Sequence, residues 1–314
     1  MDETYDVIVV GGGAAGLSGA LNLARARRSV LVVDAGEQRN LPAEGVHGLI
    51  ARDGMAPTEL VRLGRAEVER YGGAVLDARV AALGGSSGEF TVTLDDGREL
   101  DARRLLVTTG LVDELPDVPG LRDLWGSDVV HCPYCHGYEI RDRPIGVLGT
   151  NHRAAHGAQL FRQWSADLTL FLHTAPEPTA EEREGLEARG IRVVEGAVAG
   201  LETEGGRLSG VRMASGDVVP RRALAVSPRF VARSELLAGL GLTATEHPSG
   251  TGERIEGDAL GLTAVPGVWV AGNVADPMAW VASAAHQGAM AGAAINLDLI
   301  AEETRAAVAL RAAA

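Results

Sequence analysis

Short apolar, β-branched runs alternate with Ala- and Leu-rich segments near the start of the chain. Tyr5–Val10 is the first such run, and the segment after its glycines predicts a helix to about Arg28. A second run, Ser29–Val33, ends at Asp34. Continuous apolar runs of this length are typical of parallel strands buried on both faces. The pattern therefore predicts a strand–turn–helix–strand unit.

The same order of elements returns in the middle of the chain. Ile145–Leu148 predicts a strand, residues 149–154 a turn, the next segment a helix to about Trp164, and Leu168–His173 a second strand. Two βαβ patterns predict an α/β fold with two Rossmann-like nucleotide-binding domains. We expect the second domain to be inserted into the first.

The remaining segments predict hairpins, strands and one long helix. They are a hairpin region over 73–101 with a turn at Asp95-Asp96-Gly97, a strand over Leu105–Gly110, a linker at Pro116 and Pro119, a hairpin-like region over 191–219, a strand over Thr263–Asn273, and a helix from about Trp280 to Ala301 followed by a tail of frayed helix.

Length and composition narrow the class of protein. With 314 residues the chain has room for about two domains. Its 46% hydrophobic and 23% charged residues are ordinary for a globular protein. A net charge of −13 offers no basic face, which argues against nucleic acid as a partner. All 29 basic residues are Arg, which excludes a catalytic Lys or the Lys of a P-loop.

The uncharged segment 7–24 raises the question of a membrane span or signal peptide. Glycines interrupt this segment, and an acidic Met-Asp-Glu-Thr precedes it where a signal peptide has basic residues. No other stretch approaches the roughly 20 apolar residues that a spanning helix needs. We therefore expect a soluble, cytoplasmic protein.

The first turn carries the sequence Gly11-Gly12-Gly13-Ala14-Ala15-Gly16, a GxGxxG pattern. Gly11 suits a tight turn, Gly13 lets the backbone approach a pyrophosphate, and Gly16 lets helix and strand pack closely. The helix N-terminus then faces the phosphates, and Asp34 can accept hydrogen bonds from ribose hydroxyls. The alternative is a Gly-rich turn without a ligand, which the complete strand–turn–helix–strand context disfavours.

The only two cysteines form one Cys132-Pro-Tyr-Cys135 motif, followed directly by His136. A redox pair is the interpretation that the nucleotide-binding turn favours, since such motifs lower the pKa of a thiol. Cys-x-x-Cys-His is also the signature of c-type haem attachment, but no export signal is visible. A zinc site is disfavoured because it would crowd His131, Cys132, Cys135 and His136 into six residues. Two inert core cysteines are also disfavoured, because the loop around them is polar.

Together, the GxGxxG turn with Asp34, the Cys-x-x-Cys and the late Thr263 segment resemble low-molecular-weight thioredoxin reductase over essentially the whole chain. The resemblance implies an FAD domain made of residues 1–114 and 230–314, an inserted NADPH-type domain over 115–229 that carries the Cys-x-x-Cys, and commonly a homodimer. The FAD-binding residues that it implies are Gly11, Gly13, Ala14, Ala15, Gly16, Asp34, Gly110, Gly272 and Asn273, where the family usually has Asp at position 273.

The inserted domain departs from the reductase pattern. Asn151 stands where a nicotinamide turn needs Gly, and acidic Glu177, Glu181 and Glu182 follow the next strand where Arg residues would bind a 2′-phosphate. We expect this nucleotide site to be vestigial. A reductase skeleton of this kind is similar to the FAD-dependent dithiol oxidases that close disulfides in gliotoxin, holomycin and romidepsin. His136 in place of the usual Asp fits that group, and the Lys-free, bacterial-type composition favours the bacterial holomycin type.

That resemblance implies a reaction and a role for each catalytic residue. A small-molecule dithiol attacks Cys132 and leaves as a cyclic disulfide, while Cys135 lies against the flavin and passes two electrons to it. O2 is the expected acceptor, giving hydrogen peroxide, and His136 is the candidate to take and return protons. The alternatives are a reductase fed by NADPH or ferredoxin and a non-catalytic redox sensor.

The other histidines and Trp280 have less specific interpretations. His152 and His156, four residues apart, indicate either a metal site or a helix surface, and the sequence favours the surface, so no metal is expected. His173 and His247 are expected to be structural. For His47 and His286 the sequence allows either a contact with the flavin or a position with no role in the site. For His131 it allows either a catalytic role or a position that merely flanks the motif. Trp280 is expected to line an apolar substrate pocket or to pack.

Overall fold

The computed structural model of the protein describes residues 4–313, so the acidic start at 1–3 and the last residue of the tail lie outside the described residues. The chain divides into two compact units. The first contains the segment up to Leu41, Met55–Val112 and the segment from Phe230 onward. The second contains Pro42–Gly54 and Asp113–Arg229. The domain limits predicted from the sequence, 114/115 and 229/230, lie beside these boundaries. The sequence assigns segment 42–54 to the FAD domain, whereas in the structure this segment belongs to the second unit.

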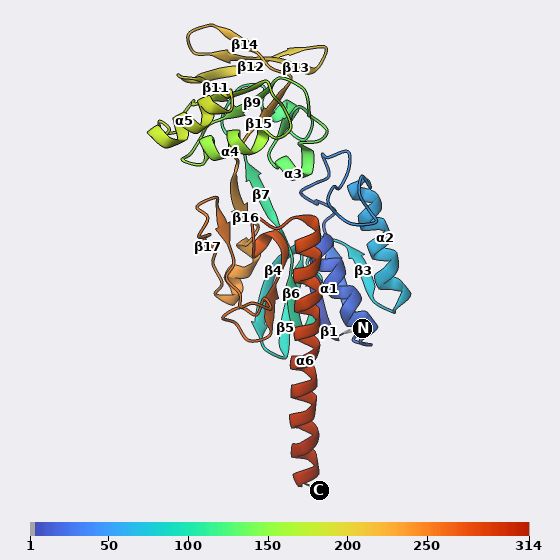
Figure 1. The fold of residues 1–314 in the computed structure, drawn as a ribbon. Coiled ribbons are helices and arrows are strands. Elements are labelled where there is room, and N and C mark those ends of the chain that lie inside the picture. The colour runs from blue at the N-terminus through green and yellow to red at the C-terminus, as the bar shows by residue number, and fades with distance from the viewer. Residues whose placement is uncertain (1–3, 314) are drawn as a thin grey trace. The chain divides into compact units, whose positions relative to one another are not determined.

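The first unit is built on a mixed seven-stranded sheet in the order β3-β2-β1-β6-β5-β4, with β19 paired to the second half of β6 (Figure 1). Strands β1, β2, β3, β6 and β19 are parallel, and β4 and β5 are antiparallel to their neighbours. The strands are β1 (Thr4–Val10), β2 (Val30–Asp34), β3 (Ala74–Asp77), β4 (Val80–Ser86), β5 (Glu89–Leu94), β6 (Glu99–Val107) and β19 (Val268–Val270).

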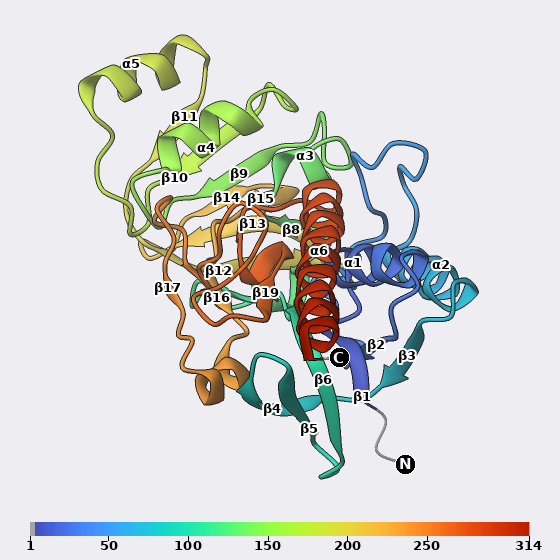
Figure 2. The ribbon, with the colours of Figure 1, turned by 90° about the horizontal axis from the view of Figure 1, so that it is seen from below.

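Helices cover one face of this sheet, and α1 and α6 run side by side there (Figures 1 and 2). Their contact depends on small residues, because a Cβ added at Gly288 or Gly292 would meet backbone atoms of α1. The apolar side chains beneath the helices form one core cluster, and a second cluster lies on the other face. The remaining elements of this unit are α1 (Ala14–Arg25), α2 (Pro57–Arg70), α6 (Val281–Ala313), η2 (Glu235–Leu240), η3 (Gly272–Val274), and the pair β17 (Thr245–Glu246) and β18 (Glu253–Arg254).

The second unit has an all-parallel five-stranded sheet in the order β11-β10-β9-β15-β8 and an antiparallel three-stranded sheet, β12-β13-β14. Strands β9, β10 and β15 of the parallel sheet are buried on both faces, and the apolar runs predicted β9 and β10. The elements are η1 (Arg122–Leu124), β8 (Val129–Val130), α3 (Pro133–His136), β9 (Ile145–Leu148), α4 (Ala154–Phe161), β10 (Leu168–Phe171), α5 (Ala180–Ala188), β11 (Arg192–Val194), β12 (Val198–Glu204), β13 (Arg207–Met213), β14 (Val218–Pro220) and β15 (Ala223–Ala225).

The chain passes into the second unit along β7 (Leu111–Glu114) and returns along β16 (Arg229–Ala232), and these strands pair with each other. The fold is thus the predicted α/β class with two βαβ units, the second lying between segments of the first.

Three predicted helix limits were wrong. Helix α1 ends at Arg25 rather than near Arg28, because the backbone turns left-handed at Arg27 with φ +64°. Helix α4 ends at Phe161 and begins only at Ala154, so His152 lies in the preceding turn and shares no helix face with His156. Helix α6 continues to Ala313, since the Ala-rich tail consists of strong helix formers.

No helix within the described part of the chain has both the length and the apolar character needed to cross a bilayer.

Candidate active site

The glycine turn between β1 and α1 has the geometry that a dinucleotide site requires. Gly11 has φ +105° and its N–H donates to the carbonyl of Val33 at 2.8 Å. A Cβ on Gly11 would lie 2.5 Å from the carbonyl oxygen of Thr108, and one on Gly16 would overlap the carbonyl oxygen of Gly11. These two glycines are therefore required by the backbone itself.

Gly13 differs from its neighbours because a Cβ there would meet no protein atom within 4 Å. It is the N-cap of α1, no side chain caps this helix, and its first turn carries no acidic residue. The N-terminal N–H groups of Ala14 and Ala15 thus have the position and dipole that bind a pyrophosphate. The open space beside Gly13 fits a ligand that approaches the backbone closely.

Asp34 lies at the end of β2 and is 4% exposed. Its Oδ1 accepts from the N–H groups of Gly12 at 3.1 Å and Gly36 at 3.2 Å. Gln38 Nε2 donates to both carboxylate oxygens, and Arg65 of α2 forms an ion pair with Oδ2. A carboxylate held in this way, next to the glycine turn, fits the ribose of a dinucleotide. Gln38 and Arg65 were not found from the sequence, because nothing in their spacing marks them as partners of Asp34.

The turn after β6 is also built around a glycine. Gly110 has φ +73°, accepts from Arg233 N at 3.1 Å through its carbonyl, and leaves open space where a Cβ would project. Thr108 Oγ1 donates to the carbonyls of Val10 and Gly11, which ties this turn to the first one. The turns that carry Gly11, Gly13, Asp34 and Gly110 thus lie in one unit, and together they fit FAD.

The late strand ends in a hydrogen-bonded loop that the sequence only partly predicted. Gly272 N donates to Gln287 Oε1 at 2.9 Å, and Gln287 Nε2 donates to Asp276 Oδ2 at 3.1 Å. Asn273 Nδ2 donates to the carbonyls of Asp276 at 3.1 Å and Ala279 at 2.9 Å. An Asp at position 273, as in the reductases, would have no donor for these carbonyls. Asn273 is thus suited to hold the loop that leads into α6.

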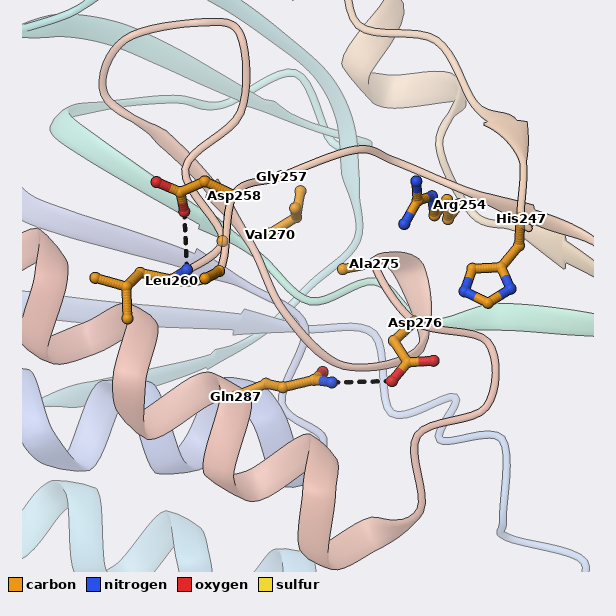
Figure 3. A pocket seen from close by; sticks show the side chains of 11 residues that line it. His247, Arg254, Gly257, Asp258, Leu260, Val270, Ala275, Asp276 and Gln287 are labelled. Carbon is orange, nitrogen blue, oxygen red and sulfur yellow. Dashed lines mark hydrogen bonds between the residues drawn. The ribbon is translucent and has the colours of Figure 1, made fainter. Parts of the chain in front are cut away.

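A pocket of about 340 Å³ lies behind this loop (Figure 3). Arg254, His247, Asp258 and Asp276 line it, and the hydrogen bond between Gln287 and Asp276 forms part of its wall. Asp258 Oδ1 accepts from two backbone N–H groups of the adjacent turn, so both of these carboxylates stabilise the local backbone. Of the polar groups that line this pocket, Asp276 and Gln287 contact the segment that carries Gly272 and Asn273.

The two cysteines form a disulfide, with Cα atoms 5.2 Å apart. Cys132 is the N-cap of α3 and its Sγ accepts from the N–H of Cys135 at 3.2 Å. Neither cysteine is fully buried, and Tyr134 between them is exposed and packs edge-on against Trp164 at 5.8 Å. A backbone donor at Sγ of Cys132 stabilises a thiolate there, which suits thiol–disulfide exchange.

His136 ends α3, and both its ring nitrogens are buried without a hydrogen-bond partner among the described residues. Burial lowers the pKa of His136 below its usual value, whereas the nearby carboxylate of Glu139 raises it and His47 lowers it. The ring is therefore neutral near pH 7 and has a lone pair for a proton. His131 lies on the other side of the motif, and its Nδ1 is 3.1 Å from the carbonyl of Val226, which requires a proton on that nitrogen.

The turn between β9 and α4 contains a hydrogen bond to one of its own side chains. Asn151 Oδ1 accepts from the N–H of Arg153 at 2.9 Å, just before α4 begins. His173 follows β10 with φ +48°, and its Nδ1 accepts from Val198 N at 3.0 Å. Thr179 and Glu182 form a capping box at α5, which places acidic residues beyond β10.

The remaining candidate histidines, His47 and His286, have different surroundings. His47 has its ring nitrogens 3.5 Å from Asp53 and 3.4 Å from Glu139, all within the second unit. His286 is exposed on α6, and the described residues contain no cluster of three or more His, Cys, Asp or Glu side chains that could hold a metal ion. Trp280 is 49% exposed just before α6, and its backbone N–H donates to Ser283 Oγ.

Comparison with known proteins matches residues 5–289 to the pyridine nucleotide-disulphide oxidoreductase family. The solved structure of HlmI is 47% identical with a TM-score of 0.91, covering 99% of this chain and 98% of that chain. An oxidoreductase from Agrobacterium tumefaciens is 39% identical with a TM-score of 0.89, covering 95% and 99%. Thioredoxin reductase sirT of Leptosphaeria maculans is 29% identical over 94% of each chain.

These relatives confirm the predicted thioredoxin reductase-like resemblance, the α/β fold class and FAD as the cofactor. The Cys132–Cys135 disulfide and the glycine turn that fits FAD provide the chemistry of a flavin-dependent oxidoreductase. The chain therefore belongs to the pyridine nucleotide-disulphide oxidoreductase family and is a thioredoxin reductase-like flavoenzyme.

Proposed function

We propose that the protein is a dithiol oxidase that closes an intramolecular disulfide in a small-molecule dithiol, with Cys132–Cys135 as the redox pair and O2 as the final acceptor. The observation that carries the proposal is the hydrogen bond from Arg153 N to Asn151 Oδ1. Asn151 stands where a nicotinamide turn has Gly, and its side chain is bonded within the turn where a pyrophosphate would approach the backbone. This supports a thiol substrate, rather than NADPH, as the source of the electrons.

The second unit supplies the groups for oxidation of the substrate dithiol. A thiolate of the substrate attacks Sγ of Cys132, and the Cys132–Cys135 bond breaks to release the Cys135 thiolate. The second substrate thiol attacks the sulfur bound to Cys132 and leaves as a cyclic disulfide, while Cys132 takes a proton. Neutral His136 takes the other proton, so the substrate loses two electrons and two protons, and the pair gains both electrons.

FAD, when bound, supplies the acceptor for this electron pair and the route by which O2 becomes hydrogen peroxide. Gly13 and the N-terminus of α1 would hold its pyrophosphate, and Asp34 its ribose. Gly110, Gly272 and the loop held by Asn273 are the further residues expected at the cofactor.

The test uses the purified holoenzyme without air. NADPH is added first and dithiothreitol second, while the visible absorbance of the flavin is followed. We expect no bleaching with NADPH, bleaching with dithiothreitol, and recovery on admitting air with one hydrogen peroxide formed per dithiol oxidised.

A reductase is the second candidate, because the relative from Leptosphaeria maculans is named a thioredoxin reductase. Rapid bleaching by NADPH would establish that direction and overturn the oxidase. Bleaching by dithiothreitol without recovery in air would overturn O2 as the acceptor and leave ferredoxin or a protein disulfide as the partner to test.

A further inference from the structure

Two distant segments of the second unit meet behind the Cys-x-x-Cys motif. His47 belongs to segment 42–54, which is separated from the motif by 77 residues of chain but lies in the same compact unit. Its Nε2 is 3.4 Å from Oε1 of Glu139, and its Nδ1 is 3.5 Å from Oδ1 of Asp53. The His47 ring thus links its own loop to the segment that follows α3.

Glu139 lies one helical turn after His136. The N–H of Gly137 donates to the carbonyl of Pro133 at 2.7 Å, and that of Ile140 donates to the carbonyl of His136 at 3.3 Å. Helical hydrogen bonding therefore continues past α3, and residues three apart share one side of a helical turn. Burial has the largest effect on the pKa of His136 and lowers it, while the charge of Glu139 raises this pKa and that of His47 lowers it.

The His136 ring itself makes no hydrogen bond that fixes its orientation or its charge within the described residues. A buried imidazole that accepts a proton needs a nearby negative charge, because burial disfavours the charged ring. Glu139 is well placed for this role. Its side chain is 39% exposed and could turn to solvent, so a contact on its outer side is needed to hold it.

We propose that Glu139 is a positioning residue that stabilises the protonated ring of His136, and that His47 holds Glu139 in place for this task. The inference rests on the proposed function only for the direction of electron flow. The proton that leaves the substrate thiol moves to the His136 ring, Glu139 balances the new positive charge, and the proton leaves to solvent when the cysteine pair is oxidised again. No electron or further reactant enters this step.

The experiment compares Glu139→Gln, Glu139→Asp and Asp142→Asn with the wild-type holoenzyme. Asp142→Asn is the matched control, because Asp142 is an exposed carboxylate three residues further along, and Asn tolerates its left-handed backbone. The C2–H resonance of His136, assigned with His136→Gln, is titrated by NMR in the oxidised enzyme. Anaerobic flavin reduction by dithiothreitol is measured over the same pH range.

We expect Glu139→Gln to move the His136 titration to lower pH by about one unit, since it removes an opposite charge close to the ring. Flavin reduction should slow roughly 3- to 10-fold, because a weaker base accepts the proton less readily. Glu139→Asp should restore part of both changes, and Asp142→Asn should change neither.

An unchanged His136 titration in Glu139→Gln would overturn the proposal, even if the rate fell. A Glu139→Gln variant that lost its fold would leave Glu139→Asp to decide, since the shorter side chain must give an intermediate titration. Neither readout involves O2, so a failure of the oxidase proposal appears separately as wild-type flavin that dithiothreitol bleaches and air does not restore.

Discussion

The two strand–turn–helix units of the molecule have the same order of elements but differ in the turn before their helices. At α1 the N-cap is Gly13, no side chain accepts from the first N–H groups, and open space lies where a Cβ would project. At α4 the side chain of Asn151 accepts from the N–H of Arg153. Neither helix has a side-chain cap, but the turn before α1 leaves open space for a ligand, whereas the turn before α4 is held by a hydrogen bond of its own side chain.

The ends of the second strands differ in the same sense. Strand β2 ends in the buried carboxylate of Asp34, a group that can accept from ribose hydroxyls. Beyond β10 lies His173, whose ring accepts from the backbone N–H of Val198 at the start of β12. A side chain that serves the fold at this position is not available to a nucleotide.

The comparison shows that the same order of elements can carry an open turn in one unit and a turn bonded to its own side chain in the other. In the second unit Asn151 accepts a backbone donor of the turn, and α4 still forms without a side-chain cap. The following experiments test this division between a unit that binds the flavin and a unit that carries the disulfide.

The largest effect is expected from Cys132→Ser and Cys135→Ser. Each should lower dithiol turnover by about a thousandfold or more, because a single thiol cannot form the internal disulfide. Each should keep its FAD, since the glycine turn lies in the other unit. Turnover is measured as oxygen consumption with dithiothreitol, and FAD by its absorbance after desalting. A single variant with more than a tenth of wild-type turnover would contradict the role of the pair.

Gly13→Ala tests the open turn of the first unit. We expect FAD to bind about 100-fold more weakly, equal to about 2.7 kcal/mol, because the methyl group enters the space of the pyrophosphate. The fold should be unaffected, since that methyl group meets no protein atom. Isothermal titration of the apoprotein with FAD measures this change.

Gly84→Ala in β4 is the matched control, because a Cβ there also meets nothing within 4 Å. Equal FAD affinity in Gly13→Ala and Gly84→Ala would show that the open space at Gly13 has no part in cofactor binding.

Asn151→Ala tests the internally satisfied turn of the second unit. Loss of the acceptor for Arg153 N should lower the free energy of unfolding by about 1 kcal/mol, as expected for one intramolecular hydrogen bond. NADPH should still leave the flavin unbleached, because His173 and the acidic residues beyond β10 remain. Urea unfolding and anaerobic absorbance provide the two readouts, with His152→Ala in the same turn as the control. Reduction by NADPH in Asn151→Ala would show that Asn151 alone closes the site.

The smallest effect is expected on the free energy of unfolding at acidic pH. Burial lowers the pKa of His136 and of His173, both in the second unit. The unfolded chain then binds more protons than the folded one below the ordinary histidine pKa of about 6.5, so stability falls as the pH drops below that value and is retained above it. Urea unfolding at pH 7.5 and 5.5 should show a smaller loss in His136→Gln than in the wild type. Equal losses would indicate that His136 does not titrate differently in the two states.

Much of the fold and of the site follows from short windows of the chain. The runs Tyr5–Val10 and Val30–Asp34 with the glycines between them predict the first unit, because period, turn residues and strand ends are local properties. The Cys132-Pro-Tyr-Cys135 motif likewise forms a disulfide because its two residues are only three apart. Asn151 marked the closed second turn for the same reason, since its partner is Arg153.

Other parts of the site depend on residues that are distant in the chain. The role of Asn273 as a donor to the loop of Asp276 and Ala279, the contact of Gln287 with Gly272, and the ion pair of Arg65 with Asp34 had no signal in the sequence. The same holds for the position of His47 beside Glu139, which the sequence left open between a flavin contact and a bland position.

The sequence by itself thus determined the two βαβ units, the flavin turn, the redox pair and the family. Only the tertiary structure decided which side chains hold those groups in place. The physical reason is that periodicity specifies which face of an element is buried, whereas the partner of a side chain depends on how separate elements pack. Segment 42–54 illustrates this, because its composition predicts only a loop, and packing alone places His47 with the unit that carries the disulfide.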